Sequence, residues 1–204
     1  MNTWETFFRE KCIEIFTSSG EVIDIGGSLR LNTGKSNRVE ETNKWLQPYV
    51  EKVDYKILDP VPDYNPDIVG DIHNLPFDDN SKEAILCLAV LEHVKNPVKA
   101  MEELHRTLKP GGRLLIYVPF LYYYHAHKGY YGDYWRFTSD TLKLFAEPFS
   151  HFELTPVRLP VETLVRLTPL GRYMFPIWVG RKIDQVLYKN GSEQVAGYYL
   201  YLVK

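Results

Sequence analysis

Three acidic residues each stand at the end of an apolar run that predicts a buried strand: Asp24, Asp59 and Asp71. The carboxyl ends of parallel strands meet at one edge of a sheet, where open α/β folds bind their ligands. A carboxylate at that edge can accept both hydroxyls of a ribose, which is the role we predict for Asp59. Asp71 and the adjacent Ile72 would then lie beside an adenine ring. These positions predict a site for an adenosine-like cofactor.

The glycine pair Gly26 and Gly27 follows the first of these runs. Glycine carries no Cβ, so a ligand can approach this backbone closely, and the helix start that follows would offer N–H donors to an anionic group. Asp24 must be hydrogen-bonded if it is buried, and it could orient the glycine loop without touching the ligand. Structural interpretations also remain open: a tight turn for the glycines, a helix cap for Asp59 and a simple turn for Asp71.

Spacing excludes two other nucleotide-binding motifs. The dinucleotide fingerprint requires G-x-G-x-x-G, which the residues from Gly26 to Arg30 do not supply. Residues 34–36 read Gly-Lys-Ser, as at the end of a phosphate-binding P-loop, but the first glycine of that motif would have to stand at Leu29. A nucleotide-dependent dehydrogenase is therefore disfavoured.

A second group of candidate residues lies downstream, in and around an aromatic-rich segment at residues 119–138. Histidine can remove the proton that an oxygen acceptor must lose, because its unperturbed pKa is about 6.5. Three histidines are candidates for that base: His93, His125 and His127. Each of them could instead cap a helix or lie in a solvated loop.

Two charged residues of this segment could assist the base. We predict that Asp133 orients His127, and that Arg136 binds an acidic group of the acceptor or pairs with Asp133. The pattern His125-x-His127 also suggests a metal ion, but no cysteine and no clear third ligand accompanies it. The sequence therefore predicts no metal site.

Strands that alternate with helices must position these residues. Apolar and β-branched runs predict strands at residues 21–25, 55–59, 84–90, 113–118, 151–157 and 197–203, and a further strand that ends at Gly70. Helical spacing and capping residues predict helices at residues 4–16, 38–50, 97–108 and 141–146, the third stopped by the turn at residues 109–112. This alternation implies an α/β fold with a parallel, doubly wound sheet.

The composition is that of an ordinary globular domain, with 204 residues, 45% of them hydrophobic and 25% charged. The formal net charge of -2 gives no general attraction to nucleic acid. Cys12 and Cys87 are too few for a disulfide framework, and Cys87 lies in an apolar run that predicts a buried thiol. No apolar stretch reaches the ~18 residues of a membrane span, and we see no signal-peptide core. We therefore expect a cytoplasmic protein.

Residues 159–187 form an apolar segment with Pro, Gly and basic residues interspersed. We predict a single domain, residues 1–204, with a lid or acceptor-binding insertion at residues 159–190. Basic residues beside Phe175 and Trp178 could also make weak peripheral contact with a membrane; they are Arg158, Arg166, Arg172, Arg181 and Lys182. Packing against the sheet or against a partner subunit is the alternative, and the oligomeric state stays open.

Residues 21–119 together resemble the class I S-adenosylmethionine-dependent methyltransferases, and in particular the broad type 11 family. Three motifs carry most of the resemblance: Leu75-Pro76-Phe77, Val90-Leu91-Glu92-His93-Val94 and Glu103-Leu104-His105-Arg106-Thr107-Leu108-Lys109-Pro110-Gly111-Gly112. The resemblance implies a Rossmann-like sheet of seven strands, mostly parallel, whose last strand is antiparallel. It also implies S-adenosylmethionine as methyl donor and S-adenosylhomocysteine as product.

The family's cofactor roles can be carried to the matching positions of this sequence. Gly26 and Gly27 would hold the methionine portion, Asp59 the ribose and Asp71 the adenine. The predicted cofactor set also includes Asp24, Ser28, Ile72 and Leu88. The family's first motif is usually acid-x-Gly-x-Gly, whereas this chain has Ser28 at the last glycine position, which narrows the loop.

The pattern Val-Pro-Phe … His … Asp-Tyr-x-Arg-Phe-Thr at residues 118–138 resembles methyltransferases associated with surface-polysaccharide and glycosyl-transfer pathways. It implies a small-molecule or glycoconjugate acceptor, methylated at oxygen in preference to nitrogen or carbon. A natural-product or quinone-type methyltransferase is the alternative enzyme. A non-catalytic cofactor-binding module is the alternative from another functional class.

Overall fold

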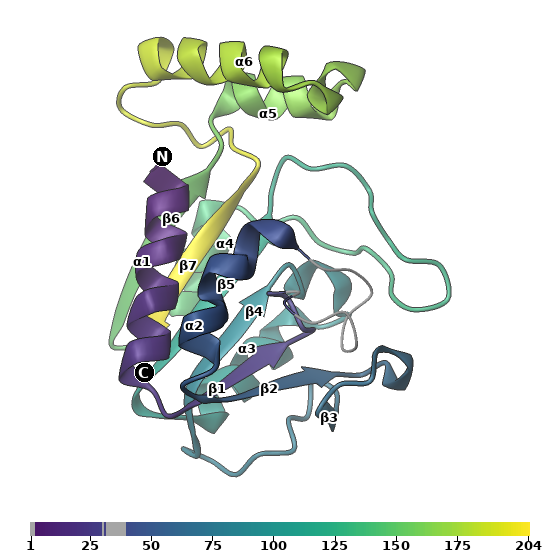
Figure 1. Ribbon diagram of the computed structural model, residues 1–204, viewed down its shortest axis with the longest axis vertical. Coiled ribbons are helices and arrows are strands. Elements are labelled where there is room, and N and C mark those ends of the chain that lie inside the picture. Colours follow the sequence, from purple (N-terminus) through teal and green to yellow (C-terminus); the bar gives the residue numbers. More distant parts are fainter. Residues whose placement is uncertain (1–2, 30, 32–39) are drawn as a thin grey trace.

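The computed structural model describes residues 3–29, 31 and 40–204. The strands of this part of the chain form one seven-stranded sheet in the order β3-β2-β1-β4-β5-β7-β6 (Figure 1). Their bounds are β1 Glu21–Ile25, β2 Asp54–Asp59, β3 Ile68–Val69, β4 Lys82–Leu88, β5 Leu108–Pro119, β6 His151–Val157 and β7 Gly197–Val203. All neighbouring strands are parallel except at β7, which runs antiparallel to both β5 and β6. The predicted fold class is confirmed.

The reversal of strand order between β1 and β4 creates a place for a ligand. The chain runs outward from β1 through β2 and β3, and then returns to add β4 on the other side of β1. The register pairs Ile25 with both Leu58 and Cys87, so the carboxyl ends of β1, β2 and β4 lie level with one another. Open α/β sheets bind their ligands at such a switch point.

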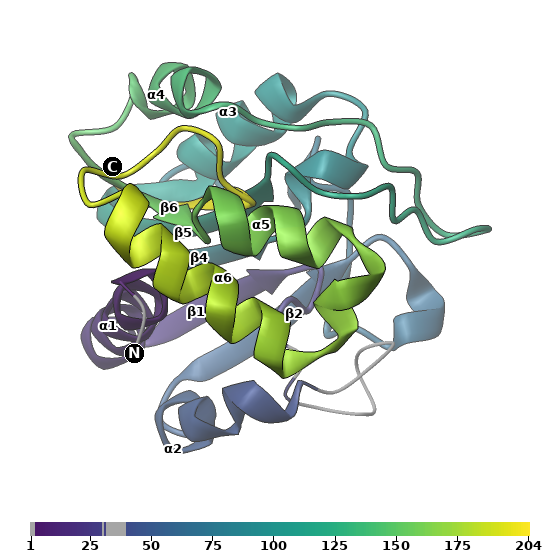
Figure 2. The same cartoon turned by 90° about the horizontal axis from the view of Figure 1, so that it is seen from above.

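Helices cover both faces of the sheet (Figure 2). Their bounds are α1 Thr3–Ser18, α2 Gln47–Val50, α3 Pro97–Thr107, α4 Ser139–Ala146, α5 Pro160–Leu167 and α6 Met174–Leu187. Side chains alternate along β4, so that Ala84 and Leu86 join the core beneath α1, while Ile85 and Cys87 join the core beneath α3 and α4. Cys87 is fully buried, as predicted.

Two charged residues of α3 connect two of the motifs on which the resemblance rests. Glu103 is buried, and its carboxylate accepts the N–H of Leu75 at 3.0 Å and the guanidinium of Arg106 at 2.7 Å. Arg106 also donates to the carbonyl oxygens of Leu75 and Phe77. The Glu103–Arg106 pair therefore fixes the segment between β3 and β4, immediately after the predicted adenine-binding residues.

The strand after α3 is longer than predicted, because β5 begins at Leu108 and not at Arg113. Leu108 pairs with Lys82, and the register shifts before the regular pairing resumes. Gly111 adopts a left-handed backbone with φ of 76°, and its N–H donates to the carbonyl oxygen of Lys204 at 2.8 Å. The glycines therefore bend this strand and do not precede it.

The predicted helix at residues 38–50 is described from residue 40 onward. It consists of a 3₁₀ helix, Glu41–Leu46, followed by the single turn of α2. Pro48 lies in the first turn of α2, where its missing N–H would have no helical partner. Most of the preceding loop, with the Gly-Lys-Ser sequence at residues 34–36, lies outside the described residues.

Between β6 and β7, α5 and α6 form a hairpin that stands apart from the sheet (Figure 1). Gly180 lets the two helices approach closely, since a Cβ there would lie 3.2 Å from the Cα of Glu162. The buried carboxylate of Glu162 accepts from Arg166 and from Arg181, each at 2.8 Å. These two basic residues therefore stabilise the hairpin itself.

None of the helices in the described ranges is long and apolar enough to cross a membrane.

Candidate active site

A cavity of about 1110 Å³ opens at the carboxyl ends of β1, β2, β4 and β5. Most of the predicted cofactor residues line it: Gly26, Ser28, Asp59, Asp71, Ile72 and Leu88. The sheet topology thus brings to one cavity residues that are widely separated along the chain. Asp24 and Gly27 belong to the adjoining loop but not to the lining.

Asp24 supports the glycine loop from beneath. Its buried carboxylate accepts the backbone N–H groups of Ser28 and Leu29, both at 3.0 Å, and the hydroxyl of Tyr55 at 2.5 Å. The Ser28 hydroxyl also donates to Asp24. Asp24 thus fixes the serine that stands at the last glycine position of the acid-x-Gly-x-Gly pattern. Burial raises the pKa of Asp24, although these donors oppose the rise. Asp24 is therefore a positioning residue that orients the glycine loop, the role considered for it from the sequence.

Two positions of the glycine loop have a left-handed backbone, a conformation that favours glycine. Gly26 and Gly27 are left-handed, with φ of 77° and 57°, and a Cβ on Gly26 would lie 2.9 Å from Cγ2 of Val90. Ala89, also in the lining, is left-handed with φ of 57°, and its N–H donates to the carbonyl oxygen of Tyr117. A non-glycine residue in this conformation is strained, and such strain clusters at binding sites. No sequence signal marks Ala89.

The two strand-end acids differ in how far their carboxylates are engaged. Asp59 is 8% exposed, and one of its oxygens accepts the N–H of Val61 at 2.8 Å. Its other oxygen has no hydrogen bond within the described part of the chain. Burial raises the pKa of the Asp59 carboxyl group. Asp71 is exposed and accepts both the backbone N–H and the Nδ1–H of His73, at 2.9 and 2.6 Å. Asp71 therefore closes a turn, while Asp59 keeps an oxygen for a ligand.

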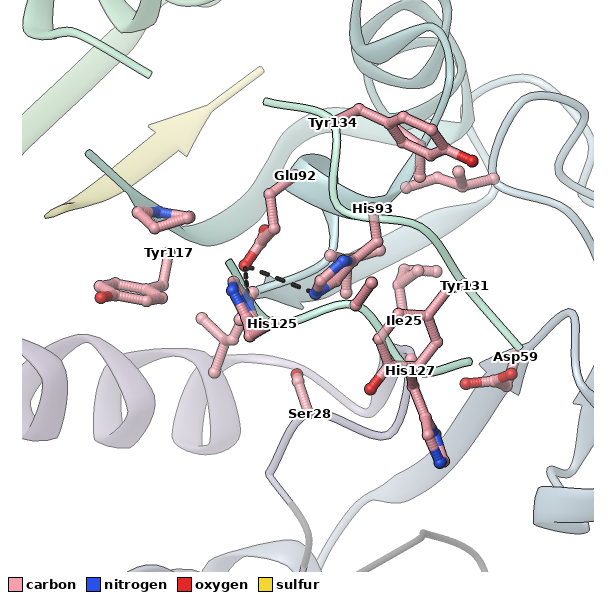
Figure 3. Close-up of a pocket in the computed structure, with 18 of the residues that line it drawn as sticks. Ile25, Ser28, Asp59, Glu92, His93, Tyr117, His125, His127, Tyr131 and Tyr134 are labelled. Atoms are coloured by element: carbon pink, nitrogen blue, oxygen red, sulfur yellow. Dashed lines mark ion pairs between the residues drawn. The ribbon is translucent and has the colours of Figure 1, made fainter. Parts of the chain in front are cut away.

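Glu92 lies at the centre of the other half of the cavity. Its side chain is 1% exposed, and its Oε1 lies 3.9 Å from Nε2 of His93 and 3.7 Å from Nε2 of His125. Figure 3 shows both rings turned toward this carboxylate. We call Glu92, His93 and His125 the His–Glu cluster. The prediction from sequence missed Glu92, although its position beside a candidate histidine was a usable signal.

A carbonyl oxygen orients each imidazole of the cluster. Nδ1 of His93 donates to the carbonyl oxygen of Gly132 at 2.7 Å, and Nδ1 of His125 donates to that of Tyr123 at 3.1 Å. A carbonyl can only accept, so Nδ1 carries the proton in both rings and Nε2 is directed to Glu92. Interaction with Glu92 raises the pKa of His125, although burial opposes the rise.

The predicted pair of His127 and Asp133 does not form. His127 lies at the exposed rim of the cavity, with its Nδ1 3.0 Å from the hydroxyl of Tyr64. The buried carboxylate of Asp133 instead contacts Arg136 at 2.6 and 2.8 Å and accepts the backbone N–H of His125 at 2.8 Å. It also lies 3.2 Å from Nδ1 of His125. Hydrogen bonds from Arg136 lower the pKa of Asp133 to about 2. The loop after β5 folds back on itself, which brings Arg136 nearer to Asp133 than His127 is.

Arg136 takes the second of its two predicted roles, and Arg158 lies in the cavity. Arg136 pairs with Asp133 and donates its other N–H groups to carbonyl oxygens of its own loop, so it holds the loop and not an acceptor. Arg158, predicted as part of a membrane-facing group, lines the cavity. Its guanidinium lies 5.3 Å from the centre of the Trp4 ring, and its buried Nε makes no hydrogen bond to a described residue but lies 3.6 Å from Oε1 of Glu162. Arg158 therefore places a positive charge in the cavity wall, paired in part with Glu162.

Comparison of the sequence with known proteins identifies a methyltransferase signature. Residues 44–116 match the type 11 family model, which is described as "Methyltransferase domain". A demethylmenaquinone methyltransferase of Paenarthrobacter aurescens is 53% identical over 49 residues, which are 24% of this chain and 19% of that protein. The mitochondrial 2-methoxy-6-polyprenyl-1,4-benzoquinol methylase of Bos taurus is 44% identical over 48 residues, or 24% of this chain and 14% of that protein. The matched segment is thus less than a quarter of either relative.

Comparison of structures extends the likeness to nearly the whole chain. A SAM-dependent methyltransferase from Archaeoglobus fulgidus superposes with a TM-score of 0.61 at 15% identity, covering 96% of this chain and 90% of that one. Phosphoethanolamine N-methyltransferase 2 of Haemonchus contortus, in complex with S-adenosyl-L-methionine, gives a TM-score of 0.51 at 14% identity, covering 96% of this chain and 52% of that one. At these identities the likeness concerns the fold.

Proposed function

Because the chain belongs to the type 11 family of class I S-adenosylmethionine-dependent methyltransferases, we propose that it transfers the methyl group of that cofactor to a hydroxyl oxygen of a small-molecule or glycoconjugate acceptor. One observation carries the proposal. A single cavity is lined by Gly26 and Asp59 from the strand ends and by the His–Glu cluster from the loops that follow. A cofactor and an acceptor bound there would meet inside it.

The lining fits the cofactor that this family uses. Gly26 lines the cavity without a side chain, so a ligand can approach its backbone closely. The second carboxylate oxygen of Asp59 can accept ribose hydroxyls, and Ile72 and Leu88 offer apolar contacts to adenine. The volume of about 1110 Å³ exceeds the ~300–1,000 Å³ of a typical small-molecule site, so it has room for an acceptor as well.

Transfer to a hydroxyl requires alignment and the loss of a proton. S-adenosylmethionine supplies an activated methyl group, and alignment of acceptor oxygen, methyl carbon and sulfur can lower the barrier by roughly 7–11 kcal/mol in favourable cases. A positioned proton acceptor adds on the order of 10²–10⁴-fold. The His–Glu cluster offers nitrogen and oxygen lone pairs inside the cavity. This is why we favour oxygen as the acceptor atom.

The cavity wall supports two acceptor classes. Tyrosines of the 119–138 segment offer hydrogen bonds and aromatic faces that suit a sugar, and Arg158 would receive an acidic group attached to it. A quinone-type acceptor is the second candidate, because the relatives above include a demethylmenaquinone methyltransferase and the same aromatic faces could stack on a flat ring.

We also propose that the α5–α6 hairpin covers the acceptor and faces a membrane. Val157 and Arg158, at its root, line the cavity. Large apolar side chains are exposed at the start of α6, namely Tyr173, Met174, Phe175 and Trp178. Arg172 and Lys182 are exposed near them. Aromatic and basic residues together suit an anionic lipid surface, on which a lipid-linked acceptor would be presented.

Calorimetric titration with S-adenosylhomocysteine tests the cofactor. Micromolar binding would support the proposal, and transfer of a labelled methyl group to sugar-nucleotide, glycolipid and phenolic compounds would then identify the acceptor class. Folded protein that fails to bind would overturn the proposal. Binding without transfer to any acceptor class would favour the non-catalytic module.

A further inference from the structure

We infer that the His–Glu cluster binds one divalent transition-metal ion in the acceptor half of the cavity. One ligand atom from each of Glu92, His93 and His125 lies within 4.8 Å of the others. Figure 3 shows both imidazoles and the carboxylate converging on the same point. The role of the ion in catalysis rests on the proposed function, but its binding does not.

The donor set selects the class of metal. Two imidazole nitrogens and one carboxylate suit first-row ions such as Zn²⁺, Mn²⁺, Fe²⁺ and Co²⁺, whereas Mg²⁺ and Ca²⁺ prefer oxygen ligands throughout. Three protein ligands leave coordination positions open, as in catalytic sites. A hydroxyl of the acceptor could take one of these positions.

The surroundings of the two histidines are those of metal ligands. A ligating histidine almost always donates its other ring N–H to a carbonyl or carboxylate, which fixes the ring and its tautomer. His93 does this with Gly132, and His125 does it with Tyr123. The Nε2 lone pairs therefore face Glu92 at 3.9 and 3.7 Å, distances beyond ordinary hydrogen-bond length.

Glu92 itself provides an independent observation. Its Oε2 is buried and has no hydrogen-bond partner among the described residues, and only 1% of the side chain is exposed. A buried carboxylate oxygen without a partner is costly. Arg136 does not pair with this oxygen, because Asp133 engages its guanidinium. A cation between Glu92 and the two imidazoles would remove this cost.

A metal ion here would change how the acceptor loses its proton. A hydroxyl bound to a divalent ion has a lowered pKa, so its proton can leave to water. The oxygen then forms its bond to the methyl carbon as the bond between that carbon and the cofactor sulfur breaks. Neither oxidant nor reductant is needed.

Metal uptake by the full-length chain tests the inference without cofactor or acceptor. After chelator treatment and dialysis, the protein is titrated with Co²⁺, and the d–d absorption of the ion is followed together with the stoichiometry. We expect one Co²⁺ per chain with imidazole ligation, displaced by Zn²⁺. Glu92→Gln and His125→Ala should each weaken affinity by at least about tenfold, whereas the control His127→Ala should retain it.

Two outcomes would overturn the inference: no stoichiometric binding by the wild type, or equal affinity in wild type, Glu92→Gln and His125→Ala. In either case the cluster would be a plain ion pair between Glu92 and His125. Circular dichroism and S-adenosylhomocysteine affinity report whether each variant folds. A wild-type chain that binds S-adenosylhomocysteine but no metal ion counts only against the metal site, and one that binds the metal ion but not S-adenosylhomocysteine counts only against the proposed function.

Discussion

The carboxylate of Glu92 and the imidazole of His125 face each other at 3.7 Å inside the cavity, although they belong to different loops. Glu92 follows β4 and His125 follows β5, and these two strands pair in parallel. Parallel neighbours end at the same edge of the sheet, so their loops must meet there. This meeting places two candidate groups for proton removal or metal binding beside the cofactor-binding strand ends.

His125→Ala should lower kcat by about 10²-fold or more, because it removes one of the three groups of the His–Glu cluster, which assists the loss of the acceptor's proton. The affinity for S-adenosylhomocysteine should stay close to that of the wild type. His127→Ala should cost much less, since its ring lies at the rim against Tyr64. Steady-state transfer of a labelled methyl group measures both. A larger loss for His127→Ala than for His125→Ala would reverse this assignment.

Asp59→Ala should weaken the binding of S-adenosylhomocysteine by about 10–100-fold, as expected when hydrogen bonds to a charged group are lost. Asp71→Ala is the matched strand-end control and should have a much smaller effect, because its carboxylate is occupied by His73. Calorimetry gives both affinities. Equal losses would mean that the turn at Asp71 is as important as the ribose contact.

Gly26→Ala should lose stability and also cofactor affinity, because the new methyl group would lie 2.9 Å from Cγ2 of Val90 and would displace this part of the cavity lining. Gly111→Ala is the control: it has almost the same φ, 76° against 77°, but no atom lies within 4 Å of its added Cβ. Both variants should lose about 1 kcal/mol from backbone strain. Thermal unfolding and cofactor titration separate the strain from the contact. Normal affinity in Gly26→Ala would show that the loop does not touch the cofactor.

The Glu103–Arg106 pair should make the free energy of unfolding depend on pH in the acid range. The hydrogen bond from Arg106 lowers the pKa of Glu103 from 4.5 to about 2 in the folded state. Because the folded-state pKa is the lower one, the stabilisation is present above about pH 4.5 and is lost as the pH falls toward about 2. Glu103→Gln should cost about 2–3 kcal/mol at neutral pH and flatten this part of the profile. Denaturant unfolding at several pH values provides the test, and an unchanged slope would contradict it.

The hairpin should bind anionic vesicles through the start of α6. Replacement of both Phe175 and Trp178 by Ser should reduce co-flotation with vesicles that contain phosphatidylserine, because these exposed rings would enter the interface. Phe152→Ser, an exposed aromatic on β6, is the control. Equal flotation of wild type and the double variant, or none by the wild type, would exclude this contact.

Much of the fold follows from local sequence patterns. The runs at residues 21–25, 151–157 and 197–203 are strands with the predicted bounds, because apolar and β-branched residues favour strands. The first and the last are mostly buried, whereas β6 forms an edge of the sheet. The start of α3 follows in the same way, since Asn96 accepts the N–H of Lys99 and Pro97 begins the helix. The alternation of strands and helices then predicts a parallel sheet whose strand ends share one edge.

The partners within the site depended on tertiary structure. Sequence spacing suggested that His127 pairs with Asp133. In the folded loop Asp133 pairs with Arg136 instead, and His125 pairs with Glu92. It likewise places Arg158 in the cavity and not on the outer face of the hairpin. The sequence by itself determined which residues end the strands, because hydrophobic periodicity and capping are local. Only the tertiary structure decided which side chains meet, because the path of a loop after its strand depends on backbone turns and buried hydrogen bonds that span distant segments.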